Sequence, residues 1–164
     1  MKRFRHPLMS NNFTPKDFKP VIKYLNKKNV ILTQSKKVYE FERKWSNWLG
    51  VKYSVFVNSG SSANLISIDI LRILKGIGKV LVPSLTWSSD ISSLIKNNMS
   101  PVFVDINLEN LSMSEKKIFQ NYDKNLKAIF LTHAQGFNGL SDDLLKFIKK
   151  KKIYLIEDVC ESHG

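Results

Sequence analysis

Two patterns of apolar and polar positions alternate along the chain: helical spacing and short continuous apolar runs. Helical spacing predicts helices over 13–29, 38–49, 65–74, 88–97 and 141–150. Apolar runs predict strands at 53–57, 79–82, 101–105, 128–132 and 153–156. The polar segment 107–125 between them is expected to hold one short helix. Strands that alternate with helices in this way favour a parallel sheet with right-handed crossovers, so the sequence predicts an α/β fold.

Residues typical of helix ends support these boundaries. Thr14-Pro15 opens the first predicted helix, and Gly50 ends the second. Ser141 is expected to cap the last helix, with two aspartates in its first turn.

Composition indicates one domain with a hydrophobic core. The chain has 164 residues, of which 43% are hydrophobic, and this argues against disorder. No apolar run approaches the roughly 18 residues of a membrane span, so no membrane partner is expected. The single cysteine, Cys160, excludes an internal disulfide framework and fits a reducing compartment. We therefore expect a cytoplasmic protein.

The net charge of +12 raises the alternative of a nucleic-acid-binding domain. Most of the 26 basic residues are lysines spread along the chain, whereas nucleic-acid surfaces usually cluster Arg and Lys with aromatic side chains. The one dense cluster, Lys149–Lys152, falls at a predicted helix end, where cations suit the helix dipole. A solvated lysine surface that favours anionic substrates is the preferred interpretation, with no nucleic-acid partner.

Candidate chemistry follows the ends of the predicted strands. The segment 58–64 combines a glycine turn, Gly60, with the hydroxyls of Ser61 and Ser62 at a helix start. Free backbone N–H groups and the helix dipole favour an anion there, and glycine permits close approach of the backbone. Neither a dinucleotide-binding nor a Walker motif is present. An ordinary capped turn is the alternative.

Trp87 and His133 follow the next two strand ends. Trp87 lies among hydroxyl residues outside any periodic apolar face, so its ring could stack on a planar ligand or pack beneath a loop. His133 could orient a neighbour or be hydrogen-bonded in the core. Since no second His or Cys stands at ligand spacing, a zinc site is not expected.

Asp158 ends the last apolar run, where ligands collect beside open parallel sheets. An acidic residue in this place can also be a turn former or a helix cap. A ligand with a phosphate, a flat ring and a protonatable ring nitrogen would use the serine pair, Trp87 and Asp158 together. Pyridoxal 5'-phosphate (PLP) is such a ligand, and an aspartate that keeps its ring nitrogen protonated lets the ring accept electrons from a carbanion.

The order of these motifs resembles the DegT/StrS-type family of PLP-dependent nucleotide-sugar aminotransferases, which have the type I aspartate-aminotransferase fold. The matching segments are 57–64, 82–87, 101–106, 127–136 and 156–164. The resemblance implies a three-layer sandwich with a mostly parallel sheet. It also implies that Ser61 and Ser62 hold the cofactor phosphate, Trp87 covers the ring and Asp158 faces its nitrogen.

Two departures from the family pattern are visible. By the resemblance, Glu161 falls at the position near the ring hydroxyl where aminotransferases of the family usually carry Gln or His. A carboxylate there looks more like the related 3-dehydratases, which replace the Schiff-base lysine with histidine. Family members are also more than twice as long. We therefore expect residues 1–164 to be an N-terminal segment and incomplete large domain, without the catalytic lysine or the small C-terminal domain, and inactive alone.

The resemblance thus implies a PLP-dependent aminotransferase that acts on a keto nucleotide-sugar, with an amino-acid donor, in surface-polysaccharide or deoxyamino-sugar biosynthesis. The complete enzyme is expected to be a homodimer. One alternative is a 4-keto-6-deoxy nucleotide-sugar 3-dehydratase of the same family. An alternative of another class is a non-catalytic fragment that binds a phosphate or a partner.

Overall fold

The computed structural model describes residues 12–162, so the basic residues 1–6 and the last two residues of the family-like ending, His163 and Gly164, lie outside it. The chain divides into two compact units, Met1–Phe56 and Val57–Gly164.

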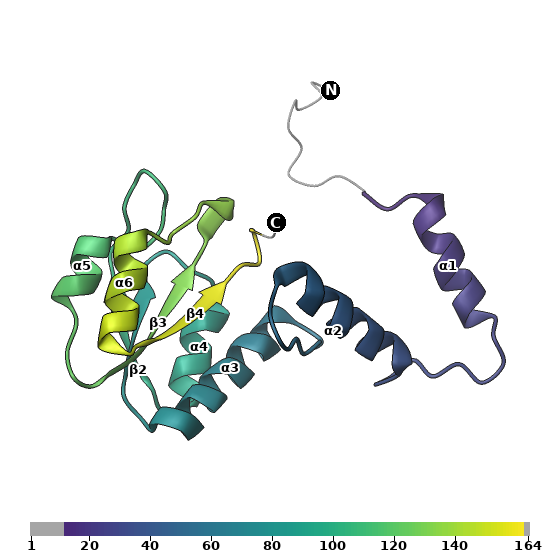
Figure 1. Ribbon diagram of the computed structural model, residues 1–164, viewed down its shortest axis with the longest axis horizontal. Helices are drawn as coiled ribbons and strands as arrows, with labels where there is room; N and C mark the ends of the chain where they lie inside the picture. The colour runs from purple at the N-terminus through teal and green to yellow at the C-terminus, as the bar shows by residue number, and fades with distance from the viewer. Residues whose placement is uncertain (1–11, 163–164) are drawn as a thin grey trace. The chain divides into compact units, whose positions relative to one another are not determined.

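The first unit contains two helices, α1 (Pro15–Leu25) and α2 (Lys36–Leu49) (Figure 1). Thr14 is the N-cap of α1 and Pro15 its first residue, as predicted, and the carboxylate of Asp17 accepts the backbone N–H of Thr14 at 2.7 Å. Gly50 ends α2 in the left-handed conformation, with φ at +74°. Among the described residues of the two helices, the only buried side chain is that of Ser46, which donates a hydrogen bond to Ser54 Oγ at 2.8 Å.

The prediction of a strand at 53–57 is wrong. This stretch is not a strand in the structure, and Tyr53 and Val55 are largely exposed. The backbone N–H of Phe56 donates to Glu42 Oε1 on α2 at 2.8 Å rather than to a neighbouring strand. An apolar run becomes a strand only where another strand can pair with it, and this run has no such partner among the described residues.

The second unit is built on a parallel sheet with the strand order β2-β1-β3-β4. Its strands are β1 (Lys79–Pro83), β2 (Ser100–Val104), β3 (Leu126–Thr132) and β4 (Tyr154–Asp158). Its helices are α3 (Gly60–Lys75), α4 (Ser88–Lys96), α5 (Glu115–Gln120), α6 (Asp142–Lys151) and the 3-10 turn η1 (Ala134–Gly136). The α/β prediction is confirmed.

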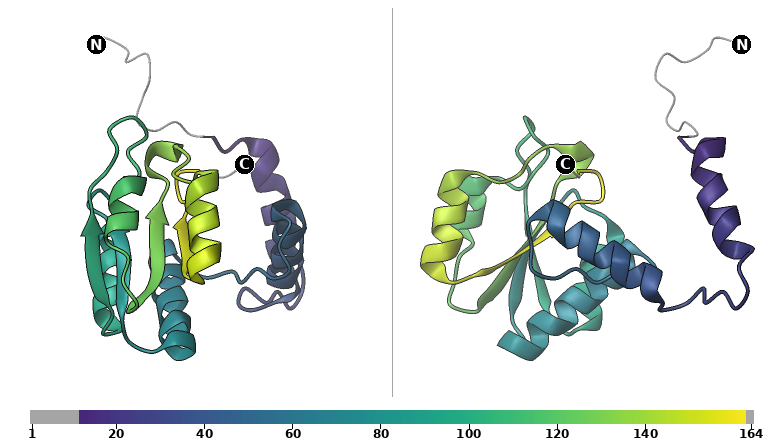
Figure 2. Two further views of the ribbon diagram at one scale, coloured as in Figure 1. Left: turned by 60° about the vertical axis from the view of Figure 1, so that its left-hand side comes forward. Right: turned by 45° about the vertical axis from the view of Figure 1, so that its right-hand side comes forward.

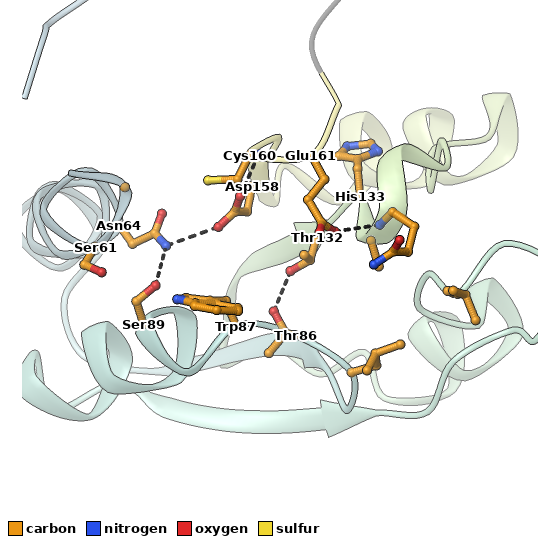
Figure 3. A pocket seen from close by; sticks show the side chains of 15 residues that line it. Ser61, Asn64, Thr86, Trp87, Ser89, Thr132, His133, Asp158, Cys160 and Glu161 are labelled. Carbon is orange, nitrogen blue, oxygen red and sulfur yellow. Dashed lines mark hydrogen bonds between the residues drawn. The ribbon is translucent and has the colours of Figure 1, made fainter. Parts of the chain in front are cut away.

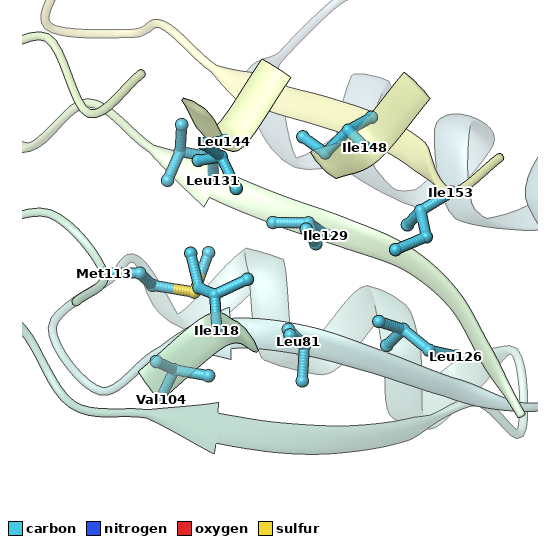
Figure 4. Close-up of a cluster of buried hydrophobic side chains, with 10 residues drawn as sticks. All are labelled: Leu81, Val104, Met113, Ile118, Leu126, Ile129, Leu131, Leu144, Ile148 and Ile153. Carbon is cyan, nitrogen blue, oxygen red and sulfur yellow. The ribbon is translucent and has the colours of Figure 1, made fainter. Parts of the chain in front are cut away.

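Alternate residues of the central strands form two hydrophobic clusters, because side chains along a strand point to opposite faces. Leu81 and Ile129 pack with α5 and α6, as Figure 4 shows. Val80 and Phe130 pack on the other face with α3 and α4. The two views of Figure 2 show helices on both faces of the sheet. The second unit is therefore a three-layer sandwich, as the resemblance implies.

All four strands run in one direction, so their carboxyl ends share one edge of the sheet. Thr132 at the end of β3 is paired in register with Asp158 at the end of β4, and Pro83 ends β1 beside them in the order of the sheet. The loops that follow these strands carry the candidate chemistry of the sequence.

Candidate functional site

A cavity of about 680 Å³ opens at the carboxyl ends of the strands, within the second unit. This volume lies in the range of cofactor and small-molecule sites, roughly 300–1,000 Å³. Figure 3 shows its labelled side chains converging from the start of α3, from the loops after β1 and β3, and from the end of β4. Its lining comprises Gly60, Ser61, Asn64, Leu85, Thr86, Trp87, Ser89, Leu111, Thr132, His133, Ala134, Gln135, Asp158, Cys160 and Glu161.

The first turn of α3 forms one end of the cavity. Ser59 is the N-cap, and its hydroxyl oxygen accepts the backbone N–H of Ser62 at 3.2 Å. Gly60 and Ser61 line the cavity, whereas Ser62 does not and instead accepts a hydrogen bond from Ser59 Oγ at 3.1 Å. The helix dipole and the unpaired N–H groups of a first turn favour an anion beside Ser61.

Trp87 provides a flat apolar surface in the cavity. It is the residue just before α4, and 70% of its surface is exposed. In Figure 3 its indole and the carboxylate of Asp158 face the same space. Of the two interpretations that the sequence left open, this placement agrees with a ring available for stacking rather than one packed beneath a loop.

Asp158 is buried at the end of β4. Its Oδ1 accepts the backbone N–H of Cys160 at 3.0 Å, and its Oδ2 accepts Asn64 Nδ2 at 3.3 Å. Burial by itself raises the pKa of this carboxyl, but the hydrogen bonds from Cys160, Asn64 and Asp90 outweigh it and hold the pKa below its ordinary value. Asp158 therefore presents a negative charge to the cavity at neutral pH.

Two residues that sequence analysis did not single out organise this carboxylate. Asn64 on α3 donates from Nδ2 to Asp90 Oδ1 at 2.7 Å and to Ser89 Oγ at 3.2 Å, as well as to Asp158. Asp90 on α4 is fully buried, and its Oδ2 accepts hydrogen bonds from the hydroxyls of Thr86 and Thr132. One signal could have drawn attention to Asp90: it is a carboxylate on a predicted helix, directly before the apolar Ile91.

His133 lies buried beside the cavity with both ring nitrogens engaged. Its Nδ1 accepts the backbone N–H of Gly139 at 3.2 Å, so the ring proton is on Nε2, which donates to Glu157 Oε2 at 3.0 Å. These contacts favour the interpretation in which His133 is a hydrogen-bonded core residue.

Glu161 is fixed at the edge of the cavity. Its Oε2 accepts the backbone N–H of Gln135 at 2.6 Å. Gln135 and Gly136 both have positive φ, and a Cβ at Gly136 would stand 2.9 Å from the carbonyl oxygen of Glu161. The turn after β3 and the segment after β4 are thus in close contact, and Gly136 permits it.

Cys160 lies between Asp158 and the start of α3. A Cβ at Gly60 would stand 3.4 Å from its Sγ. A hydrogen bond to Asp158, with burial and the negative charge of that residue, raises the pKa of the thiol to about 11. Cys160 is therefore a neutral thiol at physiological pH rather than a nucleophile.

The donor set fits PLP. An anion-binding helix start, an exposed indole and an ionised carboxylate border one cavity, and these match the phosphate, the ring and the ring nitrogen of that cofactor. No lysine lines the cavity within residues 12–162. The same residues hold no group of three or more His, Cys, Asp or Glu placed to bind a metal. None of their helices is long and apolar enough to cross a membrane.

A parallel α/β sandwich with such a cavity at the strand ends defines a class of cofactor-dependent enzyme domains. Residues 14–164 match the DegT/DnrJ/EryC1/StrS aminotransferase family, and the chain belongs to this family.

Relatives in this family include both dehydratases and transaminases. The chain is 30% identical over 165 residues to a GDP-4-keto-6-deoxy-D-mannose 3-dehydratase of Escherichia coli O55:H7, a match that covers 97% of this chain and 42% of the relative. It is 30% identical over 128 residues to a dTDP-3-amino-3,6-dideoxy-alpha-D-galactopyranose transaminase of Aneurinibacillus thermoaerophilus, covering 77% of this chain and 35% of the relative. The chain thus spans about two fifths of the length of this 3-dehydratase and of the one from Yersinia pseudotuberculosis.

The fold agrees with a solved structure. The chain superposes on the E. coli GDP-4-keto-6-deoxy-D-mannose-3-dehydratase with bound hydrated PLP with a TM-score of 0.87 and 29% identity. The superposition covers 96% of this chain and 41% of that one.

Proposed function

We propose that the cavity of the second unit holds PLP, with its phosphate at α3 and its ring between Trp87 and Asp158. The observation that carries this proposal is the convergence of Ser61, Trp87 and Asp158 on one cavity from segments far apart in the sequence. Membership of the DegT/DnrJ/EryC1/StrS family and the PLP bound in the solved 3-dehydratase support it.

Ser61 and the N–H groups at the start of α3 hold the phosphate in this proposal. Gly60 lets the backbone approach the ligand, since it has no Cβ. The side chain of Ser62 does not line the cavity, so in this proposal Ser62 serves the phosphate site only as part of the capped first turn of α3.

Trp87 covers one face of the ring, and Asp158 accepts a hydrogen bond from the protonated ring nitrogen. PLP supplies an electron-accepting ring when its nitrogen carries a proton. Asp158 suits this task because its hydrogen bonds keep it ionised, and a charge-assisted hydrogen bond of this kind is worth about 1.5–3 kcal/mol. Glu161 stands at the cavity edge, where it would meet the ring hydroxyl or the substrate.

For the reaction, we propose amino transfer from an amino acid to a keto nucleotide-sugar, which fits the transaminase among the relatives. In this proposal residues 1–164 form the N-terminal part of the cofactor-binding domain, and the catalytic lysine belongs to the part of the family that this chain does not match. A homodimer, a cytoplasmic location and a place in surface-polysaccharide biosynthesis remain predictions.

A second candidate is 3-dehydration of a 4-keto-6-deoxy nucleotide-sugar. Two observations favour it: the match to a 3-dehydratase covers 97% of the chain, and a carboxylate, Glu161, lies at the cavity edge. Mass spectrometry of the sugar product separates the two reactions in a full-length protein that contains this chain. Amino transfer replaces the keto oxygen with an amine, whereas the 3-dehydratase reaction leaves hydrogen in place of the C3 hydroxyl, which departs as water, with the two electrons supplied by the amino-acid donor.

Fluorescence titration tests the cofactor site itself. PLP is expected to quench tryptophan emission in a saturable way, and much less in Trp87→Phe. Pyridoxal, which lacks the phosphate, is expected to bind at least about tenfold more weakly than PLP, and Ser61→Ala is expected to reduce that preference. Equal binding of pyridoxal and PLP, or quenching unchanged by Trp87→Phe, would contradict the proposal. Binding of inorganic phosphate without PLP would instead support a non-catalytic phosphate-binding fragment.

A further inference from the structure

The site contains a second carboxyl group, Asp90, to which the proposed function gives no role. Asp90 is fully buried at the start of α4. It contacts Asn64, Thr86 and Thr132, and Asn64 also contacts Asp158. The two carboxyl groups are therefore neighbours in a site with little access to water.

No positive charge offsets this pair within residues 12–162, where none of the ion pairs includes Asp90 or Asp158. The main influences on the pKa of Asp90 and on that of Asp158 are burial, hydrogen bonds and the charge of the other carboxyl group, and none of them is a cation. Two ionised carboxylates this close would repel each other and lose their hydration. One proton on the pair removes the repulsion and the desolvation cost of one of the two charges.

The hydrogen bonds indicate where this proton lies. Asn64 Nδ2 has two hydrogens but three acceptors, on Ser89, Asp90 and Asp158. The hydroxyl oxygens of Thr86 and Thr132 lie 2.6 Å apart, and each also contacts Asp90 Oδ2. These three oxygen–oxygen contacts need three hydrogens, but the two hydroxyls supply only two. A proton on Asp90 supplies the missing donor. Consistent with this, burial and the neighbouring Asp158 raise the pKa of Asp90, while that of Asp158 is lowered.

We propose that Asp90 is a positioning residue: it retains one proton within its contacts with the two threonine hydroxyls, and so leaves the charge on Asp158, which Asn64 holds oriented toward the cavity. The location of the proton rests on the contacts of the cluster alone. The statement that Asp158 faces a ring nitrogen rests on the proposed function. Through Asn64, the cluster also ties β4 and α4 to α3, whose first turn is the proposed phosphate site.

Isotope-edited infrared spectroscopy of the whole chain, labelled with ¹³C at the aspartate carboxyl, tests the location of the proton without any cofactor. At pH 7 we expect the C=O band of a protonated acid in the wild type. The band should disappear in Asp90→Asn and remain in Asp143→Asn, the control at an exposed carboxylate on α6. Absence of the band in the wild type, or its persistence in Asp90→Asn, would overturn the proposal.

PLP titration of three variants tests the positioning role. Asn is neutral and can donate, so Asp90→Asn is expected to bind PLP within about threefold of the wild type. Asp90→Ala cannot donate, and Asp158→Asn lacks the charge; each is expected to bind about tenfold more weakly or worse. If Asp90→Asn is as weak as Asp158→Asn, or Asp90→Ala binds like the wild type, the role is wrong. A wild type that binds no PLP would refute the proposed function, while the infrared result would still decide where the proton lies.

Discussion

Two residues at and just beyond the end of β4, separated by Val159, are in opposite protonation states: Asp158 is ionised and Cys160 is protonated. Asp158 is ionised because backbone and side-chain N–H groups stabilise its charge, whereas that charge keeps the thiol of Cys160 protonated. Cys160 is the only cysteine of the sequence, so its reactivity reports directly on the charge of Asp158.

We predict that Cys160 reacts slowly with a disulfide reagent such as DTNB at pH 8. A pKa of about 11 instead of 9.0 leaves roughly a hundredfold less thiolate. Asp158→Asn removes the neighbouring charge, so it should lower the thiol pKa and accelerate the reaction at least about tenfold. The rate is measured against pH, with Asp143→Asn as the control. A rate unchanged in Asp158→Asn would show that the carboxylate does not act on the thiol.

Asp90 also predicts a pH dependence of stability. Its pKa is raised in the folded state, so between the ordinary value of 3.8 and the raised value the folded chain holds a proton that the unfolded chain has lost. Stability from this group therefore falls as pH rises, by at most about 1.4 kcal/mol per pH unit. Asn does not titrate, so Asp90→Asn should gain in unfolding free energy relative to the wild type from pH 4 upward, measured by urea unfolding. A constant difference across pH would contradict the raised pKa.

The sequence predicted the cavity residues that follow strand ends but not the network behind them. Trp87 and Asp158 could be found because parallel strands bring their carboxyl ends to one edge, and Ser61 because it stands at the capped start of a helix. Asn64 and Asp90 could not, since their hydrogen bonds join residues 26 and 94 positions apart, and no local pattern encodes such pairing. Ser62 could not be distinguished from Ser61 before the first turn of α3 was placed.

At the scale of elements, local sequence signals were sufficient to predict the helices but not to decide whether the run at 53–57 forms a strand. Ser59 and Ser141 cap α3 and α6 through their hydroxyls, as side chains of this type do wherever a helix begins. The run at 53–57 has the composition of a strand, but a strand also needs a partner, and the N–H of Phe56 bonds to Glu42 instead. Pairing is a property of the whole fold, so composition could not predict it.

The cap of α3 should contribute to stability because it holds the turn that carries Ser61. Ser59→Ala removes the acceptor for the N–H of Ser62 and is expected to lower the free energy of unfolding by about 1 kcal/mol in urea. Ser67→Ala, inside the same helix, serves as the control and should change it by less than about 0.5 kcal/mol. Equal effects of the two substitutions would mean that the hydroxyl of Ser59 does not cap α3.

At the scale of the molecule, the two units differ in what holds them together. Every buried hydrophobic residue of the described chain lies between Ile68 and Ile153, in the second unit. The helices of the first unit bury no apolar side chain among residues 12–56. The candidate site therefore belongs to the unit that has the core.

A chain of residues 57–164 is accordingly expected to fold and to keep the cavity. Its Tm should lie within about 3 °C of that of the complete chain, a smaller shift than a 1 kcal/mol change produces in a domain of about 100 residues. Calorimetry measures this, and near-UV circular dichroism checks the packing around Trp87. Loss of cooperative unfolding would show that the first unit stabilises the second.

The central claim is that Asp158 meets the ring nitrogen of PLP, and ¹⁵N NMR of the chain with PLP labelled at that nitrogen tests it most directly. We predict the chemical shift of a protonated ring nitrogen in the wild type at pH 8, and of an unprotonated one in Asp158→Asn. An unprotonated ring nitrogen in the wild type, or one signal shared by both proteins, would contradict the account.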